Sequence, residues 1–185
     1  MRRRRAHDAA PLILLFGAAA RRRAPADAAS RMYALVAGYL AIWTLFSLAA
    51  TGLQRIASRL LIVTPMMEAT AVAGGVLLVI AGAYQFTPLK QACLRVCQSP
   101  LGFLMSHWRD GSAGAFRLGV AHGVYCVGCC WALMLLLFAG GVMNLTAILV
   151  LTAFVLIEKL TPFGARGAWV TGGLLMGAGL WTLMR

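Results

Sequence analysis

The sequence contains long runs of apolar residues without a charged side chain, and these runs limit the fold more than any other feature. Residues 32–53 form one such run, and residues 118–157 form another of 40 residues. A helix needs about 20 apolar residues to cross the hydrocarbon core of a bilayer, so the first run predicts one span and the second predicts two. Only 12% of the residues are charged, whereas about a quarter would be charged in a soluble domain. The chain is therefore predicted to be an integral membrane protein.

The other apolar segments complete a predicted all-α, polytopic transmembrane helical bundle of about five spans. Residues 69–86 form the second span and residues 168–184 form the last. Within the 40-residue run, Gly140, Gly141 and Asn144 are typical turn residues, and we predict that they separate the third span from the fourth.

Two stretches of the chain do not fit a span. Thr87 and Pro88 interrupt the pattern, and residues 90–117 mix charged and apolar residues, so we predict a loop with one or two short amphipathic helices there. The apolar run at residues 11–20 covers only about half of a membrane, so it predicts a short amphipathic segment or the remnant of a truncated span. We divide the chain into a basic N-terminal segment, residues 1–31, and a metal-binding integral membrane domain, residues 32–185.

The positive charges of the chain predict its orientation. The formal net charge is +12, but the basic residues lie between the apolar runs and do not form a basic face with interleaved aromatic residues, so we expect no nucleic-acid partner. With the N-terminus inside, the inner segments hold 14 of the 17 lysines and arginines. By the positive-inside rule, the protein is predicted to cross the membrane several times with its N-terminus in the cytoplasm.

All five cysteines lie between residues 93 and 130, and we predict that they bind a metal ion together with one histidine of that window: Cys93, Cys97, His122, Cys126, Cys129 and Cys130. In an α-helix the last four would lie along one stripe, because His122, Cys126 and Cys129 fall within about 60° of one another. The first two are four residues apart, so they share a face if their segment is helical. Both groups adjoin the same predicted membrane surface and could converge there.

The type of ligand limits the type of metal. Thiolate ligands select Cu(I), zinc or iron–sulfur clusters, whereas calcium and magnesium need oxygen ligands. Zinc accepts cysteine and histidine, but a structural zinc site usually gathers two paired motifs in a soluble knuckle. Cu(I) also recruits methionine, for which Met66, Met67, Met105 and Met134 are candidates. We therefore favour Cu(I) over zinc, with buried packing of small thiols as the alternative to metal binding.

Several motifs occur in a fixed order along the chain: residues 84–90, Cys93, Cys97, residues 99–103, His107 and Trp108, residues 119–131, residues 140–144, Glu158 and Lys159. In this order they resemble a bacterial family of predicted metal-binding integral membrane proteins of unknown function. Some members of that family are described as copper chaperones for polyphenol oxidases (tyrosinases). The resemblance covers residue 32 to the carboxyl terminus, and family members commonly carry further hydrophobic, methionine- and proline-containing sequence at the start.

The resemblance implies a copper chaperone in the bacterial inner (cytoplasmic) membrane, which supplies a cuproenzyme client such as a tyrosinase-like oxidase. In our leading hypothesis, Cys93 and Cys97 take up Cu(I) and the stripe from His122 to Cys130 holds it. No enzymatic activity is expected, because the chain has no serine–histidine–aspartate signature, phosphate-binding loop or haem-attachment motif.

Two other functions remain open from the residues alone. The first is a membrane thiol–disulfide oxidoreductase that uses the pairs Cys93/Cys97 and Cys129/Cys130. The predicted cytoplasmic placement disfavours it, because disulfides form on the opposite side of the membrane. The second is a structural subunit of a membrane complex with packed cysteines.

Overall fold

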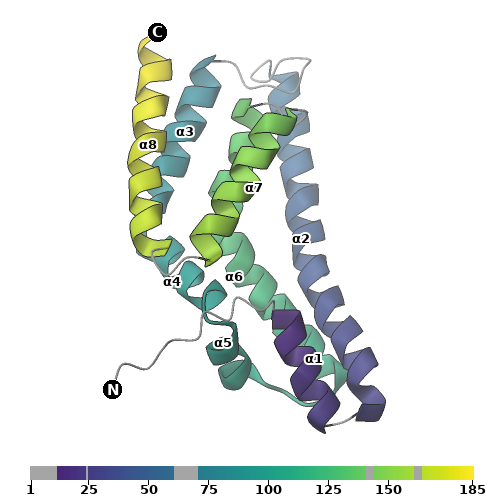
Figure 1. The fold of residues 1–185 in the computed structure, drawn as a ribbon. Coiled ribbons are helices and arrows are strands. Elements are labelled where there is room, and N and C mark those ends of the chain that lie inside the picture. The colour runs from purple at the N-terminus through teal and green to yellow at the C-terminus, as the bar shows by residue number, and fades with distance from the viewer. Residues whose placement is uncertain (1–11, 24, 61–70, 141–143, 161–163) are drawn as a thin grey trace, which may run out of the picture.

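The computed structural model describes residues 12–23, 25–60, 71–140, 144–160 and 164–185. Within these ranges the chain forms a short 3-10 helix, Pro25–Asp27, and eight α-helices: α1 (Leu12–Arg23), α2 (Ala28–Arg59), α3 (Ala71–Gln85), α4 (Pro88–Cys97), α5 (Pro100–His107), α6 (Gly111–Gly140), α7 (Leu145–Leu160) and α8 (Gly164–Met184). The all-α prediction is confirmed for these residues. The long helices α2, α3, α6, α7 and α8 run alternately up and down the molecule (Figure 1).

Among the described residues, three helical segments are long and apolar enough to cross a bilayer: Pro25–Arg59, Gly111–Leu137 and Arg166–Met184. α3 and α4 meet the same length and composition requirement together, although they are bent by 69° at the break between them. α7 has 16 residues, fewer than the about 20 that a straight crossing needs. The described part of the chain thus provides three candidate spans, or four if the bent pair is one span, and the number five stays a prediction.

α2 is longer than the span predicted at residues 32–53. It begins at Ala28 and continues through Arg55 to Arg59. Arginine has a high helix propensity, so the charges that end the apolar run do not end the helix. α6 ends at Gly140 and α7 begins at Leu145, which agrees with the predicted position of the turn, although Gly141 lies outside the described residues.

The predicted break at Thr87 and Pro88 is confirmed, and it positions the next helix. The Thr87 side chain caps α4 by accepting a hydrogen bond from the backbone N–H of Lys90 at 3.2 Å. Pro88 occupies the first turn of α4, where the N–H that it lacks would have no helical partner. The chain therefore turns sharply and lays α4 against α6. α4 and α5 are the two short helices expected between residues 90 and 117.

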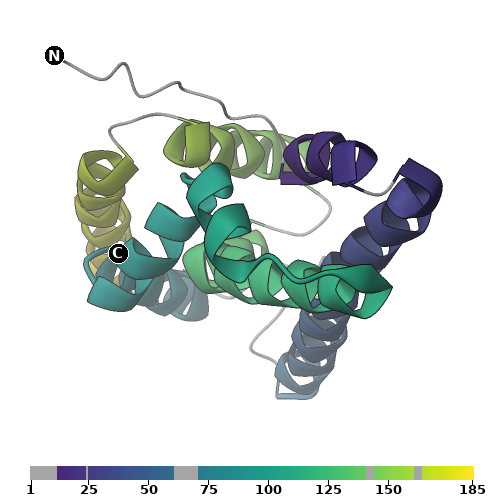
Figure 2. The same cartoon turned by 90° about the horizontal axis from the view of Figure 1, so that it is seen from below.

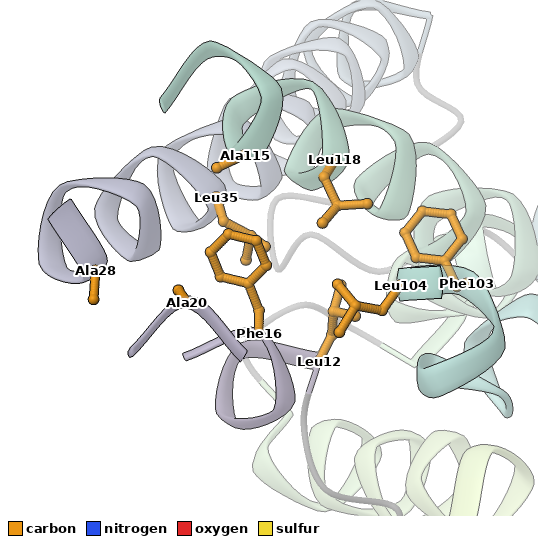
Figure 3. Packing of buried hydrophobic residues seen from close by; sticks show 9 residues of the cluster. All are labelled: Leu12, Phe16, Ala20, Ala28, Leu35, Phe103, Leu104, Ala115 and Leu118. Carbon is orange, nitrogen blue, oxygen red and sulfur yellow. The ribbon is translucent and has the colours of Figure 1, made fainter. Parts of the chain in front are cut away.

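The N-terminal apolar run forms α1, which packs on the bundle. Leu12, Phe16 and Ala20 recur every four residues along α1 and are buried in a cluster with side chains of α2, α5 and α6 (Figure 3). α1 then ends in three exposed arginines. This segment is therefore amphipathic, as expected, and its apolar face contacts the helices that follow. The division of the chain at residue 31 stays a prediction.

Most of the basic segments that the structure describes lie at one end of the molecule. α1, α4 and α5 are at this end, together with the beginnings of α2, α6 and α8 and the last turn of α7 (Figure 1), and Figure 2 shows the molecule from this side. Arg55, Arg59 and Arg185 belong to helix ends at the opposite side (Figure 1). The segments that were predicted to share the inner side of the membrane are therefore neighbours in space.

Small residues allow α2 and α6 to pack backbone against backbone. A Cβ atom added at Gly38 would collide with the carbonyl oxygen of Phe116, and one added at Gly119 would collide with that of Leu35. Close approach of this kind is the usual way in which helices associate without a hydrophobic driving force between them. α3 and α8 use glycines in the same way, since a Cβ at Gly82 would lie 2.8 Å from the carbonyl oxygen of Gly172.

We expect the substitution Gly119→Leu to destabilise the bundle, because leucine would force the α2 backbone away from α6. Overpacking of this kind costs about 1–3 kcal/mol or more. The free energy of unfolding in mixed detergent micelles, followed by circular dichroism, measures the loss. Gly173→Leu in α8 is the matched control, because no atom lies within 4 Å of a Cβ at that position. Equal stability of the two variants would contradict the role assigned to Gly119.

Candidate metal centre

Four of the predicted ligands lie in one buried cluster between α4 and α6: Cys93, Cys97, Cys129 and Cys130. The Sγ atoms of Cys97 and Cys129 are 3.7 Å apart, although 32 residues separate them in the sequence. All five cysteines are free thiols, and only Cys97 is not fully buried. The predicted convergence of the α4 pair with the cysteines of α6 is confirmed. The role of these residues as ligands stays a prediction.

The two helices come together closely because Gly128 has no side chain. A Cβ atom at this position would lie 2.9 Å from the Sγ atom of Cys93. The Tyr84 hydroxyl, near the end of α3, donates a hydrogen bond to the carbonyl oxygen of the same glycine. Gly128 therefore makes room for the Cys93 sulfur and also accepts the contact that ties α3 to this turn of α6.

Cys126 lies one turn before this cluster and has partners from two other helices. The Lys159 Nζ atom of α7 donates a hydrogen bond to its Sγ atom at 3.1 Å, and the Tyr39 hydroxyl of α2 lies 3.3 Å from the same sulfur. The backbone carbonyl of Cys126 accepts hydrogen bonds from the thiols of Cys129 at 3.1 Å and Cys130 at 2.9 Å. The three sulfurs of α6 are therefore held by weak hydrogen bonds.

His122 completes the predicted stripe, one turn below Cys126. Its ring lies 6.0 Å from that of Tyr39 and 5.3 Å from that of Phe103, measured between ring centroids. Its Nδ1 atom is buried without a hydrogen-bond partner among the described residues. Buried polar atoms nearly always have a partner, so this nitrogen is a candidate for binding an ion or a water molecule.

The methionines that were candidate Cu(I) ligands contribute less to the cluster than the cysteines do. The Met105 side chain, on α5, is 81% exposed. Met134 lines a cavity of about 270 Å³ between α2 and α6, together with Trp43, which packs against the cysteine cluster. Met66 and Met67 lie outside the described residues.

Two lysines and a glutamate surround the cluster, and sequence reasoning did not assign them to it. The Nζ atom of Lys90 is 2.7 Å from Oε2 of Glu158 and 2.5 Å from the carbonyl oxygen of Cys129. Both charged side chains are almost completely buried. One signal was present in the sequence, because Lys90, Cys93 and Cys97 recur at spacings of three and four and so share one face of α4.

Among the described residues, no group of three or more His, Cys, Asp or Glu side chains is arranged to hold a metal ion. The thiols instead form hydrogen bonds with one another, with the α6 backbone and with Lys159. Two sulfurs that share one ion at the zinc–sulfur distance of about 2.3 Å can be at most about 4.6 Å apart. The 3.7 Å between Cys97 and Cys129 is within that limit. The donor set is soft, which fits Cu(I).

A family model described as PpoB2, a copper chaperone, matches residues 8–182. This confirms the resemblance to copper chaperones associated with polyphenol oxidase. The match begins ahead of α1, earlier than the residue-32 start that the motifs indicated. No curated protein and no solved structure matches the chain.

We expect Glu158→Gln to destabilise the protein strongly, because it leaves the Lys90 ammonium buried without a counter-charge. Breaking one partner of a buried ion pair costs about 3–5 kcal/mol, whereas replacing both partners by apolar residues is often close to neutral. The double variant K90M/E158M should therefore be more stable than the single variant. Equilibrium unfolding in detergent compares them, and a double variant as unstable as the single one would contradict this account.

Proposed function

This chain belongs to the PpoB2 copper chaperone family, and from that membership we propose that it is an integral membrane protein that binds Cu(I) and supplies it to a cuproenzyme. The observation that carries the proposal is the buried cluster of free thiols from α4 and α6. A cluster of this chemistry suits a soft monovalent ion. Three helices of the described residues have the length and apolar character of membrane spans, which supports the membrane location.

We propose that Cu(I) enters at Cys97 and Cys93 and is then held within the α6 stripe that contains His122, Cys126, Cys129 and Cys130. Cys97 is the partly accessible cysteine, so it is the one that a donor can reach. Its sulfur is 3.7 Å from that of Cys129, which allows one ion to exchange ligands between α4 and α6 without being released as a free ion. The unpartnered nitrogen of His122 adds a neutral donor at the lower end of the stripe.

The end of the molecule that carries the cysteine cluster is proposed to face the cytoplasm of a bacterium. The basic segments gather at this end (Figure 1), and positive charge is enriched on the cytoplasmic side of inner-membrane proteins. The N-terminus would then be cytoplasmic and the carboxyl terminus would lie on the opposite side. The recipient of the copper would be a tyrosinase-like oxidase, as the family resemblance implies. Binding and delivery need no catalytic step.

One observation favours a thiol–disulfide oxidoreductase as the second candidate. The sulfurs of Cys97 and Cys129 are close enough to approach each other and form a bond after a small movement. However, reactive cysteines in such enzymes lie in partly exposed sites, whereas four of the five cysteines here are buried. Copper binding is therefore the better supported function.

The copper content of the purified protein tests the main proposal. Anaerobically loaded wild-type protein should retain Cu(I), and a variant with Cys126, Cys129 and Cys130 changed to serine should lose it, because hydroxyls are poor ligands for this ion. The variant Met105→Leu is the control, since its side chain is exposed. C97S should load more slowly but reach the occupancy of the wild type. Equal copper in the wild type and the triple variant would rule out the α6 site.

Reporter fusions test the orientation. An odd number of crossings with a cytoplasmic N-terminus places Arg185 outside, so a carboxyl-terminal alkaline phosphatase fusion should be active and a green fluorescent protein fusion should be dark. The opposite pattern would mean an even number of spans or an inverted protein.

A further inference from the structure

We propose that Lys159 sets the charge of the bound complex, so that the site holds one Cu(I) ion coordinated by two thiolates. This inference rests on the proposed function and specifies how many thiolates coordinate the bound Cu(I) ion. It starts from the two lysines near the cluster, which have different partners.

Lys90 is already neutralised. Its ammonium group is 2.7 Å from the carboxylate of Glu158, and the two side chains are 0% and 2% exposed. This pair contributes no net charge to the cluster. The end of α7 is also held by Gln98, whose Nε2 atom donates a hydrogen bond to the backbone carbonyl of Glu158 at 2.9 Å. The next residue of α7 is therefore held beside α6.

Lys159 has no such carboxylate partner. None of the ion pairs found among the described residues includes it, and its Nζ atom contacts the sulfur of Cys126 at 3.1 Å. One positive charge thus remains beside the cluster. Lys159 is partly exposed, and a charge that is partly removed from water is stabilised by a compensating charge beside it.

The charge of a Cu(I) complex depends on the number of thiolates that bind the ion. When Cu(I) replaces the protons of two thiols, the two protons leave to the solvent and the product, one Cu(I) with two thiolates, carries a charge of −1. Together with Lys159 the site is then neutral. One thiolate would leave the lysine uncompensated, and three would leave a net negative charge. His122 is a neutral donor, so it can join the complex without changing this balance.

The contact with Lys159 also selects which sulfur is used. An ammonium group stabilises negative charge on the atom that it touches, so Cys126 is one of the two thiolates. The second thiolate comes from one of the two cysteines that follow Cys126 on α6 and lie in the cluster with Cys97. Lys159 itself does not bind copper. It acts through the charge that it places next to a ligand, in the way that outer groups orient and tune metal ligands in other sites.

A charge series at position 159 tests this inference in the full-length chain. The Cu(I) affinity of each variant is measured anaerobically in detergent by competition with a chromophoric Cu(I) chelator. Lys159→Arg should bind like the wild type, because it keeps the charge. Lys159→Met, which keeps the length, should bind about 10–100-fold more weakly, and Lys159→Glu should bind more weakly still. Arg95→Met is the matched control, because Arg95 is an exposed cation between Cys93 and Cys97 on α4.

X-ray absorption at the copper edge gives a readout that a purely structural role would not change. The wild type should show two sulfur ligands per Cu(I). Lys159→Met, loaded to saturation, should show one sulfur ligand. Without the lysine charge, a single thiolate already neutralises Cu(I), so a second thiolate is not needed. Three sulfur ligands in the wild type would overturn the inference.

The remaining outcomes separate the two levels of proposal. If the wild type and Lys159→Met bind Cu(I) equally well, Lys159 does not balance the charge, but the proposed function stands. If Lys159→Arg, Lys159→Met and Lys159→Glu all lose binding and stability together, the residue acts by packing and the inference is wrong. If the wild type binds no Cu(I), the proposed function fails and the inference fails with it.

Discussion

An ammonium group that is shielded from water among sulfur and apolar side chains must find charged or polar partners, and Lys90 finds them on two other helices. Its side chain starts on α4, pairs with Glu158 of α7 and donates a hydrogen bond to the backbone of Cys129 on α6. Three helices that are far apart in the sequence are joined at this one atom. The arrangement of the cysteines depends on it, because α4 supplies two of them and α6 supplies the other three.

A buried ion pair of this kind is a weak source of net stability, because desolvation offsets much of the Coulomb attraction. Its effect is better described as selection among arrangements. Apolar contacts between helices tolerate sliding and rotation, and the glycine contacts of α2 with α6 restrict that pair only. The Lys90 contacts require one rotation of α4 and one position for the end of α7. The thiols can then be held by weak hydrogen bonds, which an incoming soft metal ion can replace.

Sequence reasoning predicted the features that follow from local patterns. The break at Pro88, the turn after Gly140 and the shared face of Cys93 and Cys97 each depend on residues close together in the chain. The convergence of the two cysteine groups was also predictable, because both adjoin the same predicted membrane surface. The contacts of Lys90 and Lys159 were not, since their partners are 68 and 33 residues away. Periodicity identifies the face of a helix on which a residue lies, but it does not identify the neighbouring helix.

The adjacent residues Glu158 and Lys159 show why that distinction matters. On a helix, consecutive side chains point about 100° apart, so they face different neighbours. Glu158 faces α4 and neutralises Lys90, whereas Lys159 faces α6 and contacts a sulfur. In the sequence, these two charged residues indicate only a polar connection between spans. In the fold, the first fixes the position of the helix end and the second leaves one positive charge at the thiols. The same two residues in reverse order would keep the net charge of the segment but would place a carboxylate against Cys126. A carboxylate beside the thiols would repel the thiolates that the proposed Cu(I) site needs, so the order of these residues, and not only their charge, favours that proposal.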